Sequence, residues 1–196
     1  MKWRVHVVVA LTVVVVSACG GSRQAPSVPE LTIDPVDLYP LRAGNAWSYD
    51  IDTGDASTTL AVTRVESVNG AYVTVQTGGA TVQYELRRDG IFVPADGAWL
   101  FRAPFDDGAT WPARGGRTGE VVTSLAHEET AAGEFQGCLE VRETGGKLGL
   151  VVTTIYCPFV GPVSVTSTMP SDVSDRAATV RARLRGYEVA GASTTP

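Results

Sequence analysis

Apolar and polar side chains alternate along much of this chain with a period of two residues. In the segment 81–88, single polar or charged residues separate Val82, Tyr84 and Leu86 from one another. Such alternation is typical of a β-strand with one buried and one solvent-exposed face. The segment 178–189 repeats the pattern with arginines at polar positions, and Gly186 indicates a bulge within it.

Short turn signals divide this pattern into hairpins. Asn69-Gly70, Gly78-Gly79 and Asp89-Gly90 tolerate the positive φ that tight hairpin turns require. With these turns, the pattern predicts strands at Leu60–Val68, Ala71–Thr77, Thr81–Arg88, Ile91–Pro94, Ala98–Arg102, Gly119–His127, Gly137–Thr144, Leu150–Cys157 and Ala178–Val189. No segment has a clear helical period, and the best helical candidate is a short turn at Ser171–Arg176.

These elements predict an all-β fold, an antiparallel meander that forms a curved sheet, a half-barrel or a small barrel. We assign it to a single domain at 39–190, with a C-terminal tail at 191–196. A turn at Gly44-Asn45 precedes the first strand, in which Trp47 and Tyr49 are two residues apart and both fill the core. Trp99 and Trp111 are assigned to the core as well, with ligand binding as the alternative for all four aromatic residues.

The first 18 residues have the parts of a secretory signal peptide. Lys2 and Arg4 are followed by an apolar run, Val5–Val16, which is shorter than the roughly 20 residues needed to span a bilayer. The run ends in Val16-Ser17-Ala18-Cys19, an aliphatic residue and two small residues before a cysteine. This phrase resembles the lipobox of bacterial lipoproteins.

The lipobox resemblance implies cleavage before Cys19, a diacylglycerol thioether on that cysteine and acylation of the new amino terminus. Several acyl chains hold a protein firmly on a membrane. Gly20 follows the cysteine in place of the Asp that retains lipoproteins at the inner membrane of enteric bacteria, so the outer membrane is the expected location. The segment 19–38, rich in Gly, Ser and Pro at its start, is expected to be a flexible tether.

Charge narrows the set of partners. The chain has a formal net charge of −5, and loss of Lys2 and Arg4 with the signal peptide makes it −7. Nucleic acids bind clustered Lys and Arg, so this balance argues against a nucleic-acid partner. Attraction of the whole chain to anionic lipid is not expected either, so the membrane is expected to be a partner through the N-terminal lipid.

Cys138 and Cys157 remain after Cys19 is lipidated, and an oxidising compartment favours a disulfide between such a pair. A turn at 146–149 places the two cysteines directly opposite each other in a hairpin. A tighter turn at Gly145-Gly146 separates them by four residues, which is too far for a bond. We favour the wider turn and a structural disulfide.

Several phrases match a further family pattern. Tyr39 to Tyr49 fits "(F/Y)PLxxGNxWxY", Ala132 to Val141 fits "AG.F..C..V", and 156–161 lies at a "YAPGVG"-like turn with Cys157 and Phe159 in place of Ala and Gly. Together with Asp89–Ile91 and Pro104–Trp111, they resemble a class of uncharacterised bacterial envelope lipoproteins. The resemblance covers Tyr39 to Gly161 and implies an antiparallel β fold like the half-barrels of LolA/LolB-type carriers. It implies no activity.

Residues that could carry chemistry are few. His127 is the one histidine after the signal peptide, and no HExxH, paired CxxC or GxSxG motif accompanies it. Asp106-Asp107 and Glu128-Glu129 are adjacent pairs whose members point to opposite faces of a strand. Asp50, Asp52 and Asp55 suggest a loose calcium site, with a solvated turn as the favoured alternative.

Two basic features also have structural interpretations. Gly146-Lys147 lacks the flanking residues of a phosphate loop and is interpreted as a hairpin turn. Arg181, Arg183 and Arg185 are interpreted as the solvent-exposed face of an edge strand, with lipid phosphates as the alternative contact. We therefore predict no catalytic residue, no metal site and no cofactor.

The sequence supports a non-enzymatic, lipid-anchored envelope module that works by binding or assembly, with an envelope protein as its partner. A carrier of lipid or another hydrophobic ligand is the sharper alternative, and an envelope hydrolase with converging carboxylates is the third. An apolar cavity of several hundred Å³ would favour the carrier. A filled interior would favour the binding module.

Overall fold

The computed structural model describes residues 33–54, 57–170 and 177–190. Its elements, in chain order, are α1 (Pro35–Leu38), β1 (Ala46–Asp52), β2 (Thr59–Asn69), β3 (Tyr72–Thr77), β4 (Ala80–Arg87), β5 (Gly90–Val93), the 3₁₀ turn η1 (Pro94–Asp96), β6 (Ala98–Arg102), β7 (Thr110–Pro112), the 3₁₀ turn η2 (Arg114–Gly116), β8 (Arg117–Thr130), β9 (Gly133–Gly145), β10 (Val151–Cys157), β11 (Gly161–Met169) and β12 (Ala178–Glu188).

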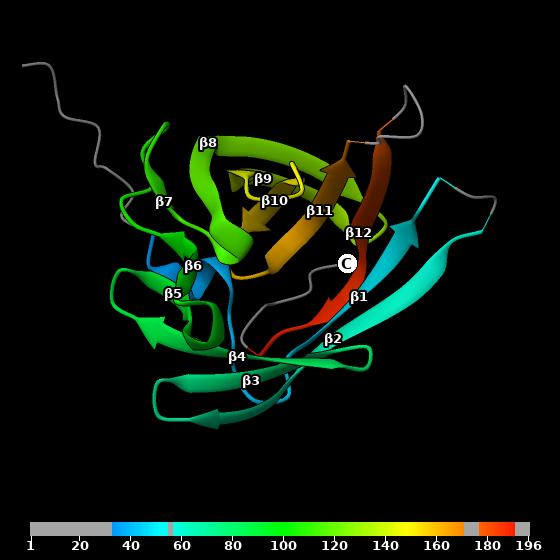
Figure 1. Cartoon of the computed structure of the whole chain (residues 1–196). Helices are drawn as coiled ribbons and strands as arrows, with labels where there is room; N and C mark the ends of the chain where they lie inside the picture. Colours follow the sequence, from blue (N-terminus) through cyan, green and yellow to red (C-terminus); the bar gives the residue numbers. More distant parts are fainter. Residues whose placement is uncertain (1–32, 55–56, 171–176, 191–196) are drawn as a thin grey trace, which may run out of the picture. The chain divides into compact units, whose positions relative to one another are not determined.

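Twelve strands in the described ranges form one antiparallel sheet, which confirms the predicted all-β meander (Figure 1). The sheet order is β6-β5-β4-β3-β2-β1-β12-β11-β10-β9-β8-β7, so the first and last strands of the chain pair with each other. The two sheet edges, β6 and β7, meet at a single bridge between Trp99 and Ala113. The sheet is thus a nearly closed barrel whose seam lies between β6 and β7.

The predicted hairpins are present, with small shifts in two of the turns. Gly78-Gly79 forms the turn between Thr77 and Ala80 as expected. The other two turns are centred on 70–71 and 88–89, one residue away from the predicted dipeptides. Gly70 and Gly78 adopt positive φ angles of 57° and 58°. Hydrophobic pairing across the strands, rather than the turn dipeptide alone, sets the register.

Two strands, β7 and β11, and the helix α1 were not predicted. Strand β11 is rich in Ser, Thr, Gly and Pro, a composition that resembles a loop, and β7 is only three residues long. Helix α1 lies within the predicted tether 19–38: Asp34 caps it by accepting a hydrogen bond from Val36 N (3.0 Å), and Pro35 occupies its start. The helical turn predicted at Ser171–Arg176 and the tail at 191–196 lie outside the described residues.

The segment around α1 belongs to the folded unit, which begins at Ile33 rather than at the predicted Tyr39. Leu38, Tyr39 and Leu41 are at most 5% exposed. Helix α1 packs against β5 and β11, which are six positions apart in the sheet order. The segment therefore crosses one end of the barrel and inserts apolar side chains into it. None of the described helices is long and apolar enough to cross a membrane.

Asn45 fixes the start of β1 at the same end of the barrel. Its Nδ2 donates to Pro40 O (2.6 Å), and its Oδ1 accepts from Ala190 N (3.0 Å). Gly44, with a φ of 88°, makes the predicted turn before the strand. One buried amide thus joins the segment after α1 to the end of β12.

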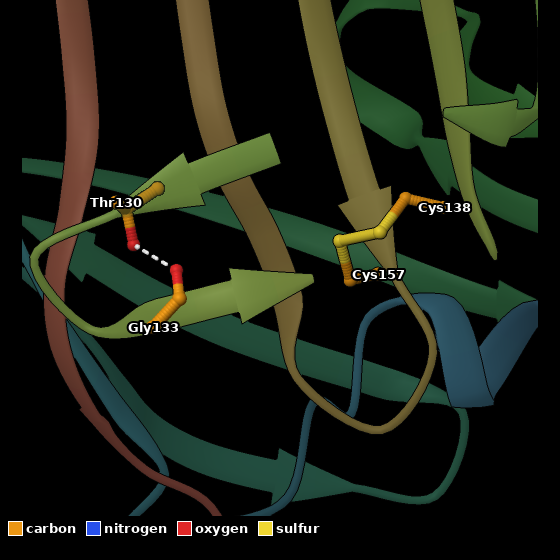
Figure 2. Close-up of a disulfide and its surroundings, with 4 residues drawn as sticks. All are labelled: Thr130, Gly133, Cys138 and Cys157. Carbon is orange, nitrogen blue, oxygen red and sulfur yellow. Dashed lines mark hydrogen bonds between the residues drawn. A yellow bond between two sulfur atoms is a disulfide. The ribbon is translucent and has the colours of Figure 1, made fainter. Parts of the chain in front are cut away.

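The hairpin of β9 and β10 has the register that the wider turn predicts. Leu139 pairs with Tyr156 and Glu143 pairs with Val152, so Cys138 and Cys157 lie opposite each other and form the predicted disulfide (Figure 2). The Gly146-Lys147 dipeptide lies in the turn of this hairpin, as expected.

The hairpin of β8 and β9 is the longest in the sheet and is bent. Its ladder shifts register at three places between Val121 and Glu128, and such irregularities bend a strand. Its tip reaches β12, where Ala132 N donates to Leu184 O (3.3 Å). Figure 2 shows this tip at Thr130 and Gly133.

Candidate functional site

The interior of the barrel is filled by a cluster of aromatic rings. Tyr39 contacts Trp47, Tyr84 and Tyr156 with ring centroids 5.1, 6.3 and 6.4 Å apart, and Phe101 lies 4.8 Å from Tyr156. These five side chains come from β1, β4, β6, β10 and the segment after α1, and none is more than 8% exposed. The described residues thus occupy the space that a carrier would leave for its ligand.

Hydrogen bonds fix the aromatic cluster in place. Trp47 Nε1 donates to Val160 O (2.6 Å), and Tyr49 Oη donates to Pro162 O (2.8 Å). Burial raises the pKa of the Tyr49 hydroxyl, which therefore stays neutral. Trp47 and Tyr49 are core residues, as predicted, and so are Trp99 (9% exposed) and Trp111 (3%).

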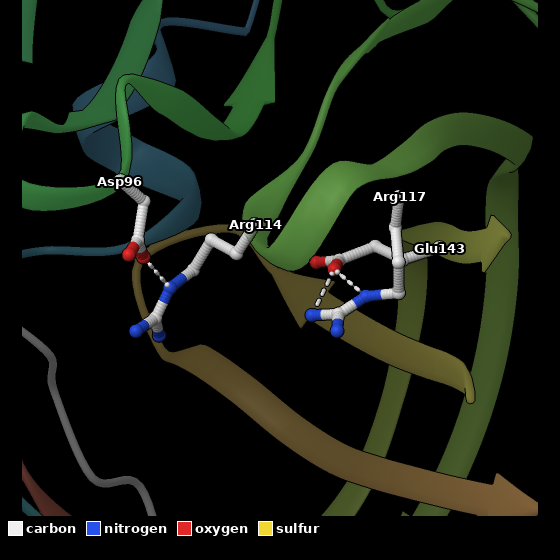
Figure 3. A network of polar contacts seen from close by, with 4 residues as sticks. All are labelled: Asp96, Arg114, Arg117 and Glu143. Carbon is white, nitrogen blue, oxygen red and sulfur yellow. Dashed lines mark hydrogen bonds and ion pairs between the residues drawn. The ribbon is translucent and has the colours of Figure 1, made fainter. Parts of the chain in front are cut away.

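A polar network lies at the seam of the barrel (Figure 3). Arg114, in η2 after β7, binds Asp96 of η1 before β6 at 2.5 Å, so this ion pair crosses the seam. Arg117 on β8 binds Glu143 on β9 at 2.8 Å, and Glu143 is 6% exposed. Burial raises the pKa of Glu143, although hydrogen bonding to Arg117 opposes the effect.

A buried carboxyl with a raised pKa is a feature that active sites and structural ion pairs share. Here Glu143 Oε2 accepts from both Nε (2.9 Å) and Nη2 (2.8 Å) of Arg117. Burial also raises the pKa of Tyr84, whereas the positive charge of Arg114 lowers it. Each ionised group of the network thus has an oppositely charged partner, and the network joins strands on both sides of the seam.

A charged cleft of about 460 Å³ brings together three groups of residues that are far apart in the sequence. Asp50 and Asp52 on β1 lie opposite Arg183 and Arg181 on β12, and Glu129 at the tip of the β8–β9 hairpin also lines the cleft. Arg185 binds Asp50 at 3.0 Å, and Arg183 approaches Glu128 at 3.9 Å. Residues singled out separately in the sequence therefore form one surface.

One earlier interpretation is wrong at this cleft. The arginine stripe does not lie on an edge strand, because β12 pairs with β1 on one side and β11 on the other. Its arginines are exposed, as predicted, and lie beside carboxylates of β1. The proposed calcium ligand Asp55 lies outside the described residues, and no group of three His, Cys, Asp or Glu suited to a metal occurs among those described.

The remaining sequence candidates are dispersed over the barrel. His127 is about half exposed and pairs with Glu134, Nε2 to Oε1 at 2.9 Å. Asp107 accepts a hydrogen bond from Ser124 N (3.2 Å), which is a structural contact at the start of the bend in β8. Lys147 lines an open cavity of about 770 Å³ between the glycine-rich turns at 115–116 and 145–146. The predicted lipidation residue, Cys19, lies outside the described residues.

Comparison with known proteins gives little further information. No family model matches the chain, and no curated protein matches it. One solved structure, from Bacteroides fragilis, is similar: a "putative exported protein with YmcC-like fold", 14% identical, with a TM-score of 0.47 over 75% of this chain and 96% of the other.

Proposed function

We propose that this chain is a lipoprotein of the bacterial outer membrane, anchored through acyl groups on Cys19, that acts as a non-enzymatic binding or assembly module. The observation that carries the proposal is the filled interior. Tyr39, Trp47, Phe101 and Tyr156 meet at the centre of the barrel and are between 0 and 5% exposed.

A filled interior favours binding at the outer surface over transport of a ligand inside. Pockets for lipids or other small molecules bury most of the ligand surface and usually measure 300–1,000 Å³. The cavities of about 460 and 770 Å³ described above lie open to solvent, and the former is lined by Asp, Glu and Arg. Leu38, the last residue of α1, and Tyr39, which follows it, occupy the end of the barrel where a ligand would otherwise enter.

The pairing of the ionisable groups favours binding over catalysis. A hydrolase of the carboxylate type needs two carboxyl groups that converge on one bond, one of them protonated and the other ionised. Here Glu143 is bound to Arg117, and the acidic side chains of the charged cleft face Arg181 and Arg183. Paired charges of both signs on an exposed surface are typical of protein–protein contacts, where they determine specificity and association rate.

The filled interior is tested by titrating the purified full chain with a fluorescent fatty acid. A binding module gives no saturable fluorescence change, because the probe finds no apolar cavity. A protein that carries fatty acids in an apolar cavity is titrated in parallel and shows that the probe responds to binding. Saturation at one probe per protein would contradict the proposal and establish the carrier alternative.

The anchor is tested by replacing Cys19. In the native host, the wild-type chain is expected in the outer-membrane fraction, and Cys19→Ser is expected to leave that fraction because it cannot carry the thioether. Cys138→Ser with Cys157→Ser is the matched control, since it removes two sulfur atoms and leaves Cys19 in place. Outer-membrane retention of Cys19→Ser would contradict lipid anchoring at this residue.

A further inference from the structure

An exposed phenylalanine stands on the turn between β10 and β11. Phe159 is 60% exposed and has a φ of 64°, which makes it the one non-glycine residue with positive φ in the described ranges. The left-handed region is unfavourable for a residue with a Cβ. A bulky side chain kept in such a conformation at the surface suggests a functional contact.

The surrounding residues hold this turn on both sides. Phe159 N donates to Asp37 O of α1 (2.6 Å), and Trp47 Nε1 donates to Val160 O (2.6 Å). Cys157, two residues earlier, is bonded to Cys138. The turn is therefore fixed to α1, to β1 and to β9, and the aromatic ring projects from a rigid support.

Further exposed apolar groups lie on α1, to which the turn is hydrogen-bonded, and on the β2–β3 hairpin. Val36, next to Asp37, is 38% exposed and Val68 is 42% exposed. Both line an open, mainly apolar cleft of about 370 Å³, together with Pro40 and Leu86. We call Val36, Val68 and Phe159 together the tether-end surface, because α1, which bonds to the turn of Phe159 and shares the cleft with Val68, directly follows Ile33, where the folded unit begins.

The length of the preceding segment determines what this surface can reach. Cys19 to Thr32 comprises 14 residues. A segment of that length cannot span more than about 50 Å even when fully extended. A domain anchored at Cys19 therefore stays close to its membrane, and the tether-end surface lies at the attachment point.

We propose that the tether-end surface contacts the lipid bilayer, with Phe159 inserted at the boundary of head groups and acyl chains. The inference rests on the proposed anchor at Cys19. Aromatic side chains are favoured at this boundary, where the apolar ring leaves water. Because the tether keeps the surface near the bilayer, a contact too weak to recruit a free protein is sufficient to orient an anchored one.

The test places a tryptophan at the surface. Trp47, Trp99 and Trp111 are at most 9% exposed, so an added surface tryptophan is the one that lipid can reach. The lipidated full chain carrying Phe159→Trp is reconstituted in phosphatidylcholine vesicles with and without bromine on the acyl chains. Leu60→Trp is the matched control: Leu60 is 58% exposed and pairs with Asp50, four residues along β1 from Ala46.

We expect brominated lipid to quench Phe159→Trp several-fold more than Leu60→Trp, with a blue shift of its emission. Val36→Trp, on α1, is expected to follow Phe159→Trp and gives a second probe should either variant fold poorly. Equal quenching of the two sites in protein that floats with the vesicles would overturn the membrane contact and leave the anchor intact. Failure to float would contradict the anchor and this inference together. A blue shift without bromine quenching would indicate a protein contact and would also overturn the inference.

Discussion

Phe159 occupies a backbone conformation that glycine tolerates far better than phenylalanine. Its φ of 64° costs a residue with a Cβ about 1–2 kcal/mol, part of which the flexibility of unfolded glycine offsets. We expect Phe159→Gly to raise the free energy of unfolding by up to about 1 kcal/mol, measured by urea denaturation. Phe159→Ala, which loses the ring but keeps the Cβ, is the control. A marked loss of stability in Phe159→Gly alone would show that the ring supports the fold.

Glu143 makes the stability of the barrel depend on pH. Burial raises its pKa above the ordinary 4.5, so its contribution to stability is fully present below about pH 4.5 and is lost as pH rises through the folded pKa. Glu143→Gln cannot titrate. We expect wild type to lose stability relative to Glu143→Gln as pH rises above about 4.5, measured as the difference in unfolding free energy. A difference that grows in the opposite direction would mean that Arg117 dominates.

Single residues were predictable where a local rule applied. The pairing of Cys138 with Cys157 followed from the position of a turn, because hairpin register is set by turn length. The surroundings of Glu143 were not predictable, because Arg114, which binds Asp96 and acts on Glu143, is placed there only when η1 and η2 meet at the seam. That meeting depends on the closure of the whole sheet.

The pairing of β5 with β6 requires a glycine at its first position. A Cβ on Gly90 would collide with the backbone of Phe101 and lie 2.9 Å from Arg102 Cα. We expect Gly90→Ala to lower the free energy of unfolding by about 1–3 kcal/mol, the usual cost of overpacking. Gly79→Ala is the matched control, because its Cβ would have no neighbour within 4 Å and its φ is not positive. Equal urea midpoints for the two variants would contradict this account of the β5–β6 edge.

Strands were predictable where alternation and turn signals coincide. Strands β3 and β4 satisfy both conditions, and their shared turn at Gly78-Gly79 was placed correctly. Strand β11 was missed because its Ser and Thr residues resemble a loop, whereas pairing with both β10 and β12 makes it a strand. The arginine stripe of β12 was assigned to an edge because charge on one face does not reveal how many neighbours a strand has.

At the scale of the whole barrel, the sequence predicted the class of fold but not its closure. Local alternation contains no information on which distant strands pair, so the contact of β1 with β12 and the seam between β6 and β7 could not be derived. The filling of the interior could not be predicted from the sequence either. Tyr39 was assigned to the start of the domain, but nothing in its neighbourhood indicated that it would contact Tyr84 and Tyr156.

Removal of this ring tests whether the interior is filled as described. Tyr39→Ala deletes a side chain that is 5% exposed, and we expect a loss of about 3–5 kcal/mol in unfolding free energy together with a new apolar cavity. The variant should bind xenon or benzene, and wild type should not. Tyr72→Ala, at a 46% exposed tyrosine of β3, is expected to change stability by about 0.5 kcal/mol or less and to bind neither. Xenon binding by wild type would mean that space remains in the barrel.

The central claim, a lipid-anchored module with a filled interior, is tested most directly by native mass spectrometry of the protein extracted gently from its own membrane. The predicted mass is that of the chain beginning at Cys19, increased by its covalent acyl groups and by nothing else. A lipid molecule bound non-covalently, one per protein and in addition to the acyl groups, would contradict the filled interior. A mass without covalent acyl groups would contradict the anchor.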